Sequence, residues 1–300
     1  MAFLHAAGGS HSGPKSGLKS KSITPYLLLL PGLLWLVTFF IIPIFSLAST
    51  STMVRPAGAQ VGTYVQEFRF ANYIDAFQAN QEQYLRSFVY AAIATILALA
   101  ISYPLAYMIA FKAGKYRNIL LVLVVAPFFT SFLLRTIAWT QILGDEGPIV
   151  STLKLLPFVG DSLRLTSTPF AVISGLTYNF LPFMTLPLYA SLERIDPRTL
   201  EAAGDLYANA FTTFRKVTVP LSMPGVVAGT LLTFIPAAGD FVNAQILGNP
   251  NTKMIGNVIE SRFFAVVDYP TAAALSFTLM ATILILVTLY IRKSGTDELV

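Results

Sequence analysis

The sequence predicts an all-α integral membrane protein with six transmembrane helices. Of its 300 residues, 55% are hydrophobic and 12% are charged, whereas soluble domains carry about 25% charged residues. Six apolar runs are each long enough to cross a bilayer, which takes about 20 residues in a helix. The segments between these runs are too short for a sizeable soluble domain, so we expect only spans, loops and two tails.

The first run follows residues 1–25, a Gly-, Ser- and Lys-rich segment that we expect to be a disordered cytoplasmic tail. Lysines precede this run, as in a signal peptide, but its apolar stretch exceeds the roughly 7 to 15 residues of a signal core, so we interpret it as a retained span. All six spans form one domain over 26–292, and 293–300 form a second cytoplasmic tail. We place the spans at Tyr26–Ala48, Phe88–Phe111, Asn118–Leu143, Pro169–Leu192, Pro220–Leu247 and Thr271–Ile291.

The distribution of Lys and Arg predicts the orientation. With the N-terminus inside, twelve of the 20 basic residues fall in inner segments, seven in longer outer loops, and Arg135 within a span. Because basic residues are enriched in cytoplasmic loops, we expect both termini to be cytoplasmic. The net charge of +5 is therefore a topology signal, and it predicts no nucleic-acid partner.

A charged and strongly patterned segment lies between the fourth and fifth spans. Asp196 followed by Pro197 is typical of a helix start, and we expect one helix over 197–216. It should end in a short extended link before Pro220, because the residue before a proline avoids the helical region. One apolar stripe would consist of Leu200, Ala203, Tyr207, Ala210, Phe211 and Phe214.

Another face of this helix begins with acidic residues and would consist of Glu201, Asp205, Asn209, Thr212 and Lys216. A membrane-surface helix would instead favour Lys and Arg on its polar face. Docking of the helix into a groove of another protein fits the pattern, and so does an ordinary packed surface helix. The pattern alone leaves these two interpretations equally open.

Two parts of the chain resemble a known family. Glu201-Ala202-Ala203, followed by Val217-Thr218-Val219-Pro220 and Pro224-Gly225, resembles the EAA motif of ABC importer permeases. The family usually has Gly at the seventh motif position, where this chain has Tyr207, which suggests a differently shaped docking surface. From about Tyr26 to Arg292 the chain also resembles polyamine (spermidine/putrescine) permease subunits, in ANYIDAF, APFFTSFLLRTIAWTQILGDEGPI, YNFLPFMTLPLYASLERIDPRTLEAAGDL and FIPAAGDFVNAQILGNP.

The resemblance implies a type I ABC importer permease (MetI-like) fold that works by alternating access in a bacterial inner membrane. It implies four kinds of partner: a second permease subunit in a heterodimer, two ATP-binding subunits, an extracytoplasmic solute-binding protein, and membrane lipid. The 197–216 helix would be the coupling helix that contacts an ATP-binding subunit. The implied contact residues are Glu201, Ala202, Ala203 and Gly204, with Asp205 and Tyr207 at the margin.

The chain itself is not expected to be an enzyme. It contains no GxxxxGKS or GxxxxGKT loop to bind ATP, so ATP and Mg²⁺ should be bound by partner subunits. It has no cysteine, which excludes thiolate metal sites and disulfides. We therefore expect no cofactor and no metal on this chain.

Arg135 and Asp240 are the only charges within the predicted spans. At 1.5 Å per residue, Arg135 would lie about 26 Å and Asp240 about 24 to 30 Å from the cytoplasmic end of its span. One interpretation is that the two charges pair, or that Asp240 acts alone, at the outer mouth of a translocation path. The other is that both side chains snorkel to the outer interface. Tyr178, Asn179 and Phe180 could also line this path, because aromatic faces attract ammonium groups, or they could be packing residues.

Three alternatives stay open on the sequence. An importer permease for another solute, such as an inorganic anion, a metal complex or thiamine, is the nearest. A secondary transporter would normally place inward-facing ionisable groups at the midplane, often in repeated halves, and the sequence has neither feature. A membrane anchor or sensor subunit would not need spans interrupted by prolines together with a docking helix.

Overall fold

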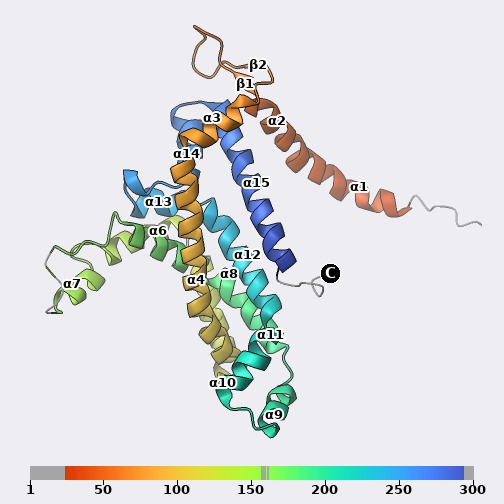
Figure 1. Ribbon diagram of the computed structural model, residues 1–300, viewed down its shortest axis with the longest axis vertical. Coiled ribbons are helices and arrows are strands. Elements are labelled where there is room, and N and C mark those ends of the chain that lie inside the picture. Colours follow the sequence, from red (N-terminus) through yellow and green to blue (C-terminus); the bar gives the residue numbers. More distant parts are fainter. Residues whose placement is uncertain (1–23, 157–159, 161, 294–300) are drawn as a thin grey trace, which may run out of the picture. The chain divides into compact units, whose positions relative to one another are not determined.

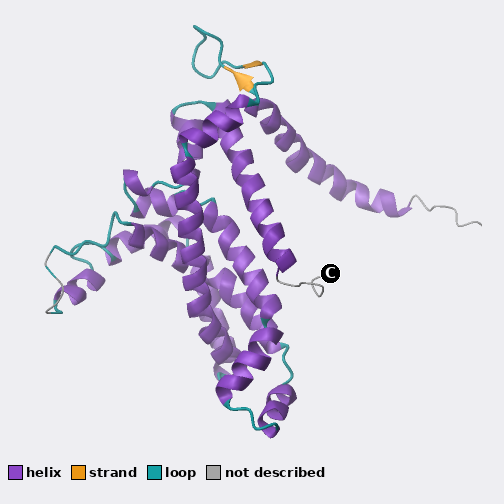
Figure 2. Ribbon diagram, viewed as in Figure 1, coloured by secondary structure: helices purple, strands orange, loops and turns teal. Residues whose placement is uncertain are grey.

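The structure is a computed structural model that describes residues 24–156, 160 and 162–293. Helices dominate the described part, with one short hairpin (Figures 1 and 2). The chain divides into two compact units, Met1–Leu47 and Ala48–Val300, which we describe one at a time. Residues 1–23 and 294–300, which hold most of both predicted tails, lie outside the described residues.

Among the described residues, four helices are long and apolar enough to cross a membrane, and two bent helix pairs raise the number to six if each pair is one span. The four helices match the first, second, fourth and sixth predicted spans. They are Leu28–Ser51, Gln81–Phe111, Pro169–Glu193 and Tyr269–Lys293.

The first unit contains α1 (Thr24–Leu36), the π-helical turn η1 (Val37–Ile41) and the start of α2 (Ile42–Ser51). The side chains described in this unit are exposed, and they are large and hydrophobic from Leu28 to Phe45 almost without interruption. A helix that is apolar on every side is suited to lipid or to a partner helix.

The core of the second unit is formed by three helices, α4 (Gln81–Phe111), α8 (Pro169–Glu193) and α12 (Met223–Ala238). Small residues allow their backbones to come close, as is usual between membrane helices. On α4 these are the buried alanines at 91, 94, 98 and 106. On α12, a Cβ atom added to Gly229 would lie 2.8 Å from Met184 Sδ of α8.

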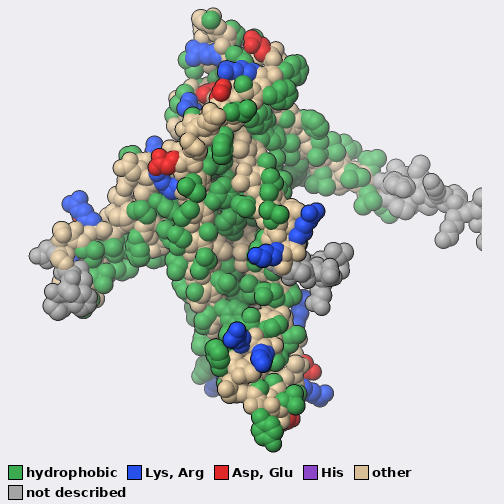
Figure 3. All heavy atoms as spheres, viewed as in Figure 1, with side chains coloured by type: hydrophobic (Ala, Val, Ile, Leu, Met, Phe, Trp, Pro, Cys, Tyr) green, Lys and Arg blue, Asp and Glu red, His purple; other side chains and the backbone are tan. Residues whose placement is uncertain are grey.

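A second cluster packs α15 (Tyr269–Lys293) against α3 (Ala71–Ala79) and α14 (Ile255–Glu260). The Tyr84 hydroxyl of α4 donates a hydrogen bond of 2.7 Å to the Leu275 carbonyl in α15. This end of the unit also carries the antiparallel hairpin of β1 (Met53–Val54) and β2 (Val65–Gln66). Figure 3 shows hydrophobic side chains over much of one face, with charged groups mainly near the ends of the elements.

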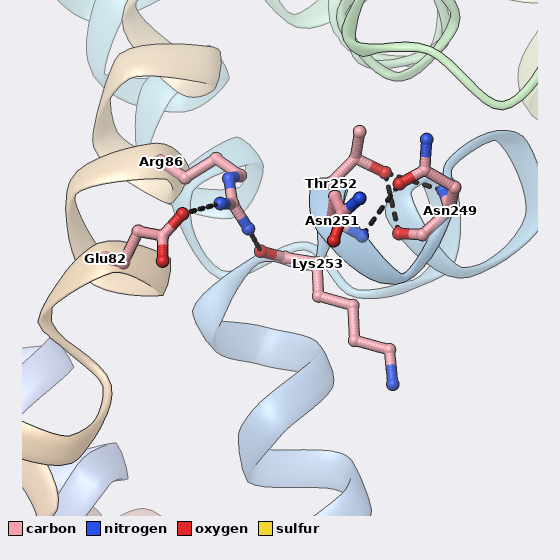
Figure 4. Close-up of polar contacts among 6 residues, drawn as sticks. All are labelled: Glu82, Arg86, Asn249, Asn251, Thr252 and Lys253. Carbon is pink, nitrogen blue, oxygen red and sulfur yellow. Dashed lines mark hydrogen bonds and ion pairs between the residues drawn. The ribbon is translucent and has the colours of Figure 1, made fainter.

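The connection that follows α13 (Val242–Leu247) is held to α4 by polar contacts (Figure 4). Arg86 forms an ion pair with Glu82, one helical turn away, and donates a hydrogen bond of 2.9 Å to the Lys253 carbonyl. The short helix η5 (Pro250–Thr252) just before Lys253 has a reciprocal cap. The backbone N–H of Asn249 donates to Thr252 Oγ1 at 2.7 Å, and the side-chain Oδ1 of Asn249 accepts from the backbone N–H of Asn251. Two further short elements are α7 (Pro148–Lys154) and the π-helical turn η6 (Ser261–Ala265).

The third predicted span is not one straight helix. It consists of η2 (Gly114–Tyr116), α5 (Arg117–Val125), η3 (Ala126–Phe129) and α6 (Phe132–Ile142), with a bend of 97° between η3 and α6. The break occurs where Thr130 and Ser131 take extended backbone angles after Pro127. Extended residues cannot continue the helical hydrogen bonds, so the chain turns sharply here.

The fifth predicted span, Pro220–Leu247, is also wrong as a single helix. Here α12 ends at Ala238, and the separate helix α13 (Val242–Leu247) begins after a break. Asp240 lies in this break, and its Oδ1 accepts a hydrogen bond of 2.8 Å from the backbone N–H of Asn243. This local bond competes with continuation of the helix. The bent pair in this region is instead Ala210–Leu221 with Met223–Ala238, at 63°.

Candidate functional site

The connection between α8 and α12 forms one end of the second unit, beyond the ends of α4 and α8 (Figure 1). It begins with α9 (Pro197–Asp205). The Asp196 side chain accepts a hydrogen bond of 3.0 Å from the Arg198 amide, and Pro197 is in the first turn. The predicted start of this helix is therefore confirmed.

The predicted end at residue 216 is wrong, because α9 stops at Asp205 in a Schellman motif. The Ala208 amide donates to the Ala203 carbonyl at 3.1 Å and the Tyr207 amide to the Gly204 carbonyl at 2.9 Å. Both bonds require a left-handed residue just after the helix, and Tyr207 supplies it with φ of +60°. A glycine at this position would have marked the helix end in the sequence.

A second set of short helices follows. Asn209 caps α10 (Ala210–Thr213) by accepting from the Thr212 amide at 2.8 Å. The chain then continues through the π-helical turn η4 (Phe214–Thr218) into α11 (Val219–Leu221). The predicted extended link is therefore wrong. Pro220 lies within α11, directly after the π-helical turn, and the residues before it stay helical.

The predicted coupling residues lie together and are uncovered by the rest of the described chain. Glu201, Ala202, Gly204 and Asp205 are exposed and Ala203 is half-buried. A Cβ atom added to Gly204 would meet nothing within 4 Å. The predicted apolar stripe is split, since Leu200 and Phe214 are partly buried whereas Tyr207 and Phe211 are exposed.

This segment is fastened to the core helices on both sides. The Phe214 ring of η4 lies edge-on to Tyr103 and Tyr107 of α4, with centroids 5.5 and 6.0 Å apart. The Tyr103 hydroxyl is 2.7 Å from the hydroxyl of Ser222, the residue that precedes α12. Packed side chains and a hydrogen bond thus connect this segment to α4 and to the start of α12.

Arg117 fixes α5 to α8, and sequence reasoning counted it only as a topology charge. It forms an ion pair with Glu193 at the end of α8. Its Nε donates 2.5 Å to the Tyr189 hydroxyl, and its guanidinium lies over the Tyr189 ring, 5.1 Å from the centroid.

A buried polar network joins α6, α8 and α13. Asn179 Nδ2 donates to Thr136 Oγ1 at 3.2 Å and to Asn243 Oδ1 at 3.0 Å. Asn243 Nδ2 in turn donates to Asp240 Oδ2 at 3.2 Å. Sequence reasoning missed Thr136 and Asn243, because a neutral polar residue in an apolar run carries no specific signal.

The network has a fixed direction. An ionised carboxylate only accepts hydrogen bonds, so Asp240 sets the orientation of the Asn243 amide, which in turn sets that of Asn179. Asn179 Oδ1 is then left as a buried acceptor with no partner among the described residues. A buried polar atom without a partner is costly, and in a native protein it points to an additional ligand or water.

Arg135 is a second unsatisfied group beside this network. Its side chain is buried, its guanidinium lies 5.7 Å from the Phe132 ring centroid, and its Nε and Nη1 have no hydrogen-bond partner in the described part of the chain. The ion pairs formed between described residues involve neither Arg135 nor Asp240. The expected pairing is therefore not formed in this conformation.

The depth argument behind that pairing was wrong, because it assumed straight helices and Arg135 lies beyond the 97° bend. Arg135 and Asp240 are 9% and 8% exposed, so they are buried within the unit and do not extend out to an interface. The two other candidates differ from each other. Phe180 is a core residue, whereas Tyr178 lies edge-on to Trp139 at 5.5 Å and lines a cavity of 290 Å³.

Metal ligands do not converge within the described ranges, where no three or more His, Cys, Asp or Glu side chains are grouped to hold an ion. Two features of the described part stand out as candidate sites, the exposed α9–α10 segment and the network around Asn179.

Solved structures with the same fold are ABC importers. A bacterial ABC transporter that imports the acidic polysaccharide alginate matches with a TM-score of 0.68 and 18% identity, over 92% of this chain and 96% of that chain. A bacterial alginate ABC transporter in complex with alginate pentasaccharide-bound periplasmic protein matches with a TM-score of 0.69 and 19% identity, over 91% of this chain and 94% of that chain. The fold is thus that of an ABC importer permease.

Relatives with closer sequences identify the family. The spermidine/putrescine transport system permease protein PotB of Haemophilus influenzae is 38% identical over 261 residues, 87% of this chain and 90% of that protein. PotB of Escherichia coli K12 is 36% identical over 260 residues, which are 87% of this chain and 94% of that protein. No family model matches the sequence. The chain belongs to the family of ABC transporter permease proteins that contains PotB.

Proposed function

We propose that this chain is a permease subunit of an ATP-driven polyamine importer that works by alternating access. The observation that carries the substrate class is the identity of 36% to 38% with spermidine/putrescine permeases over 87% of the chain. The exposed α9–α10 segment, fastened to α4 and α12, supports the coupling role. Energy would come from separate ATP-binding subunits that hold ATP and Mg²⁺.

The remaining assembly follows from the same proposal. The α9 end of the second unit would be cytoplasmic, as the basic residues predict, and both termini would lie on that side of a bacterial inner membrane. A second permease subunit would complete the path. An extracytoplasmic solute-binding protein would deliver the polyamine at the opposite end, and the solved alginate transporter likewise includes a periplasmic protein.

The network around Asn179 is the proposed position where the path passes this subunit. A protonated amine needs hydrogen-bond acceptors when it leaves water, and the unpartnered Asn179 Oδ1 and the nearby Asp240 carboxylate are acceptors. The Tyr178 ring beside the cavity would contribute cation–π attraction. Phe180, a core residue, would only support this wall.

Arg135 and Asp240 would pair in another state of the transport cycle. Both are buried, and neither takes part in an ion pair between described residues, so pairing would recover much of the cost of burying both. We expect Arg135→Met to leave the free energy of unfolding in this state unchanged or higher, by up to about 2 kcal/mol. Polyamine uptake should fall about tenfold, as expected if the other state loses about 1.4 kcal/mol.

Thermal unfolding of the purified permease and uptake in cells test this prediction. Arg164→Met is the matched control, because Arg164 is exposed and pairs with Asp145. A clear loss of stability in Arg135→Met alone would show that its guanidinium already has a partner, and would contradict the proposed switch.

The substrate assignment is tested by uptake of labelled spermidine and putrescine into cells without other polyamine importers. Cells that carry this chain with its partner subunits should accumulate label, and cells that carry only the partner subunits should not. Equal accumulation in both would remove the polyamine assignment. Labelled thiamine and phosphate, measured in the same cells, would then identify another solute class.

A further inference from the structure

Tyr207 has a backbone conformation that its side chain disfavours. Its φ of +60° is in the left-handed region, where Gly fits and Asn is tolerated but a bulky side chain is uncommon. The Schellman hydrogen bonds at the end of α9 impose this conformation. The chain thus holds an aromatic residue at a position where glycine would be less strained.

The Tyr207 side chain gains nothing from the rest of the described chain. It is 99% exposed, and none of the hydrogen bonds or ring contacts found among the described residues involves it. Leu206 before it is 82% exposed and Phe211 on α10 is 70% exposed. These three exposed apolar residues lie at the junction of α9 and α10, and together we call them the junction patch. Exposed apolar patches of this kind mark interaction sites.

We propose that Tyr207 is the anchor of the contact with the ATP-binding subunit, and that it inserts with the rest of the junction patch into an apolar pocket of that subunit. The inference rests on the proposed function and names the residues that recognise the partner. Tyrosine is a frequent hot-spot residue, because a rigid ring buries a large area and its hydroxyl can still bond at the pocket floor. Strain held at an exposed residue fits such a role, since the compensating contacts come from outside the chain.

The charges around the junction patch favour a protein over a lipid surface. The exposed charges that precede the patch along α9 are Glu201 and Asp205, whereas exposed basic residues of the same connection lie in the first turn of α9 and in η4, at Arg198, Arg215 and Lys216. A segment that binds anionic headgroups would carry Lys and Arg in place of Glu201 and Asp205. The partner pocket should therefore have an apolar floor and a basic side chain at the rim that faces α9. The fixed backbone at Tyr207 also presents the ring in one direction, which reduces the ordering cost of binding.

The test is retention of the ATP-binding subunit by the whole complex during purification, compared for wild type, Tyr207→Asn and Tyr207→Phe. Asparagine tolerates the left-handed conformation but lacks the ring. We expect Tyr207→Asn to keep the wild-type melting temperature within about 2 °C and to lower the affinity for the ATP-binding subunit at least about tenfold. Tyr207→Phe should retain most of the affinity. Tyr116→Asn is the control, since Tyr116 is also exposed, and it should behave as wild type.

Wild-type affinity in Tyr207→Asn would overturn the anchor proposal and leave the proposed function intact. Absence of any ATP-binding subunit in the wild-type complex would overturn the proposed function itself. A Tyr207→Trp variant in nanodiscs distinguishes a lipid contact, measured as the difference from wild type with its Trp35 and Trp139. A blue shift that appears only on addition of the ATP-binding subunit supports the proposal, and one already present in lipid alone overturns it.

Discussion

Reversing the charge of Glu201 should abolish transport while leaving the permease folded. Glu201 is exposed on α9, so Glu201→Lys removes no hydrogen bond or ion pair found between described residues. The substitution does place a positive charge where the proposed partner surface is basic. Loss of a charge pair at an interface costs about 2 to 5 kcal/mol. We therefore expect at least about 30-fold weaker retention of the ATP-binding subunit and polyamine uptake at background.

The measurement combines uptake in cells with the amount of ATP-binding subunit that copurifies with the permease. Glu67→Lys is the matched control, because Glu67 is exposed next to β2 at the opposite end of the same unit. It should retain the ATP-binding subunit as wild type does. Normal retention in Glu201→Lys would show that α9 is not the coupling surface. If Glu201→Lys is missing from the membrane as well as failing to retain the ATP-binding subunit, the variant is misfolded. Glu201→Gln would then be used in its place.

A methyl group at Gly225 should strongly destabilise the second unit. A Cβ atom there would lie 2.5 Å from Ser191 Cβ and 2.7 Å from the Pro187 carbonyl oxygen, both in α8. A backbone carbonyl in a helix cannot move aside, so α12 must shift away from α8. Overpacking of this kind costs about 1 to 3 kcal/mol, and more when backbone is displaced. We expect Gly225→Ala to lower the melting temperature by at least about 5 °C.

Thermal unfolding of the purified permease tests this expectation. Gly204→Ala provides a matched control with the opposite sign, because Gly204 also lies in a helix but a Cβ atom there meets nothing within 4 Å. Alanine is favoured over glycine in a helix by about 1 kcal/mol, so this variant should be slightly more stable. Equal melting temperatures for the two variants would mean that the α8–α12 contact is looser than the structure shows.

Sequence patterns were sufficient for the helices that are apolar and uninterrupted, and insufficient where the chain breaks. Pro104 and Pro182 lie inside long helices, whereas Pro127 precedes a sharp bend. A proline raises the chance of a break in each case, and the difference depends on whether neighbouring helices support the distorted turn. Hydropathy does not contain that information.

The candidate site was partly predictable for the same reason. Asp196 and Pro197 marked the start of α9 through local chemistry, but Tyr207 concealed its end, because the residue type contradicts the conformation. Asn179 was expected at the path, whereas its partner Asn243 was not. Hydrogen bonds between α8 and α13 depend on the break at Asp240, which only the three-dimensional arrangement reveals.

Two contacts hold the η4 region to α4, and together they limit how far this connection can move by itself. Phe214 rests on α4, and Ser222, eight residues later, is bonded to Tyr103 of the same helix. A slack loop would absorb a push from outside by rearranging its own backbone before any span responded. This connection has no such slack, since moving it requires breaking ring packing and a hydrogen bond together. If α9 is the coupling surface, we expect its displacement to move α4 directly, with little of it absorbed by the connection itself.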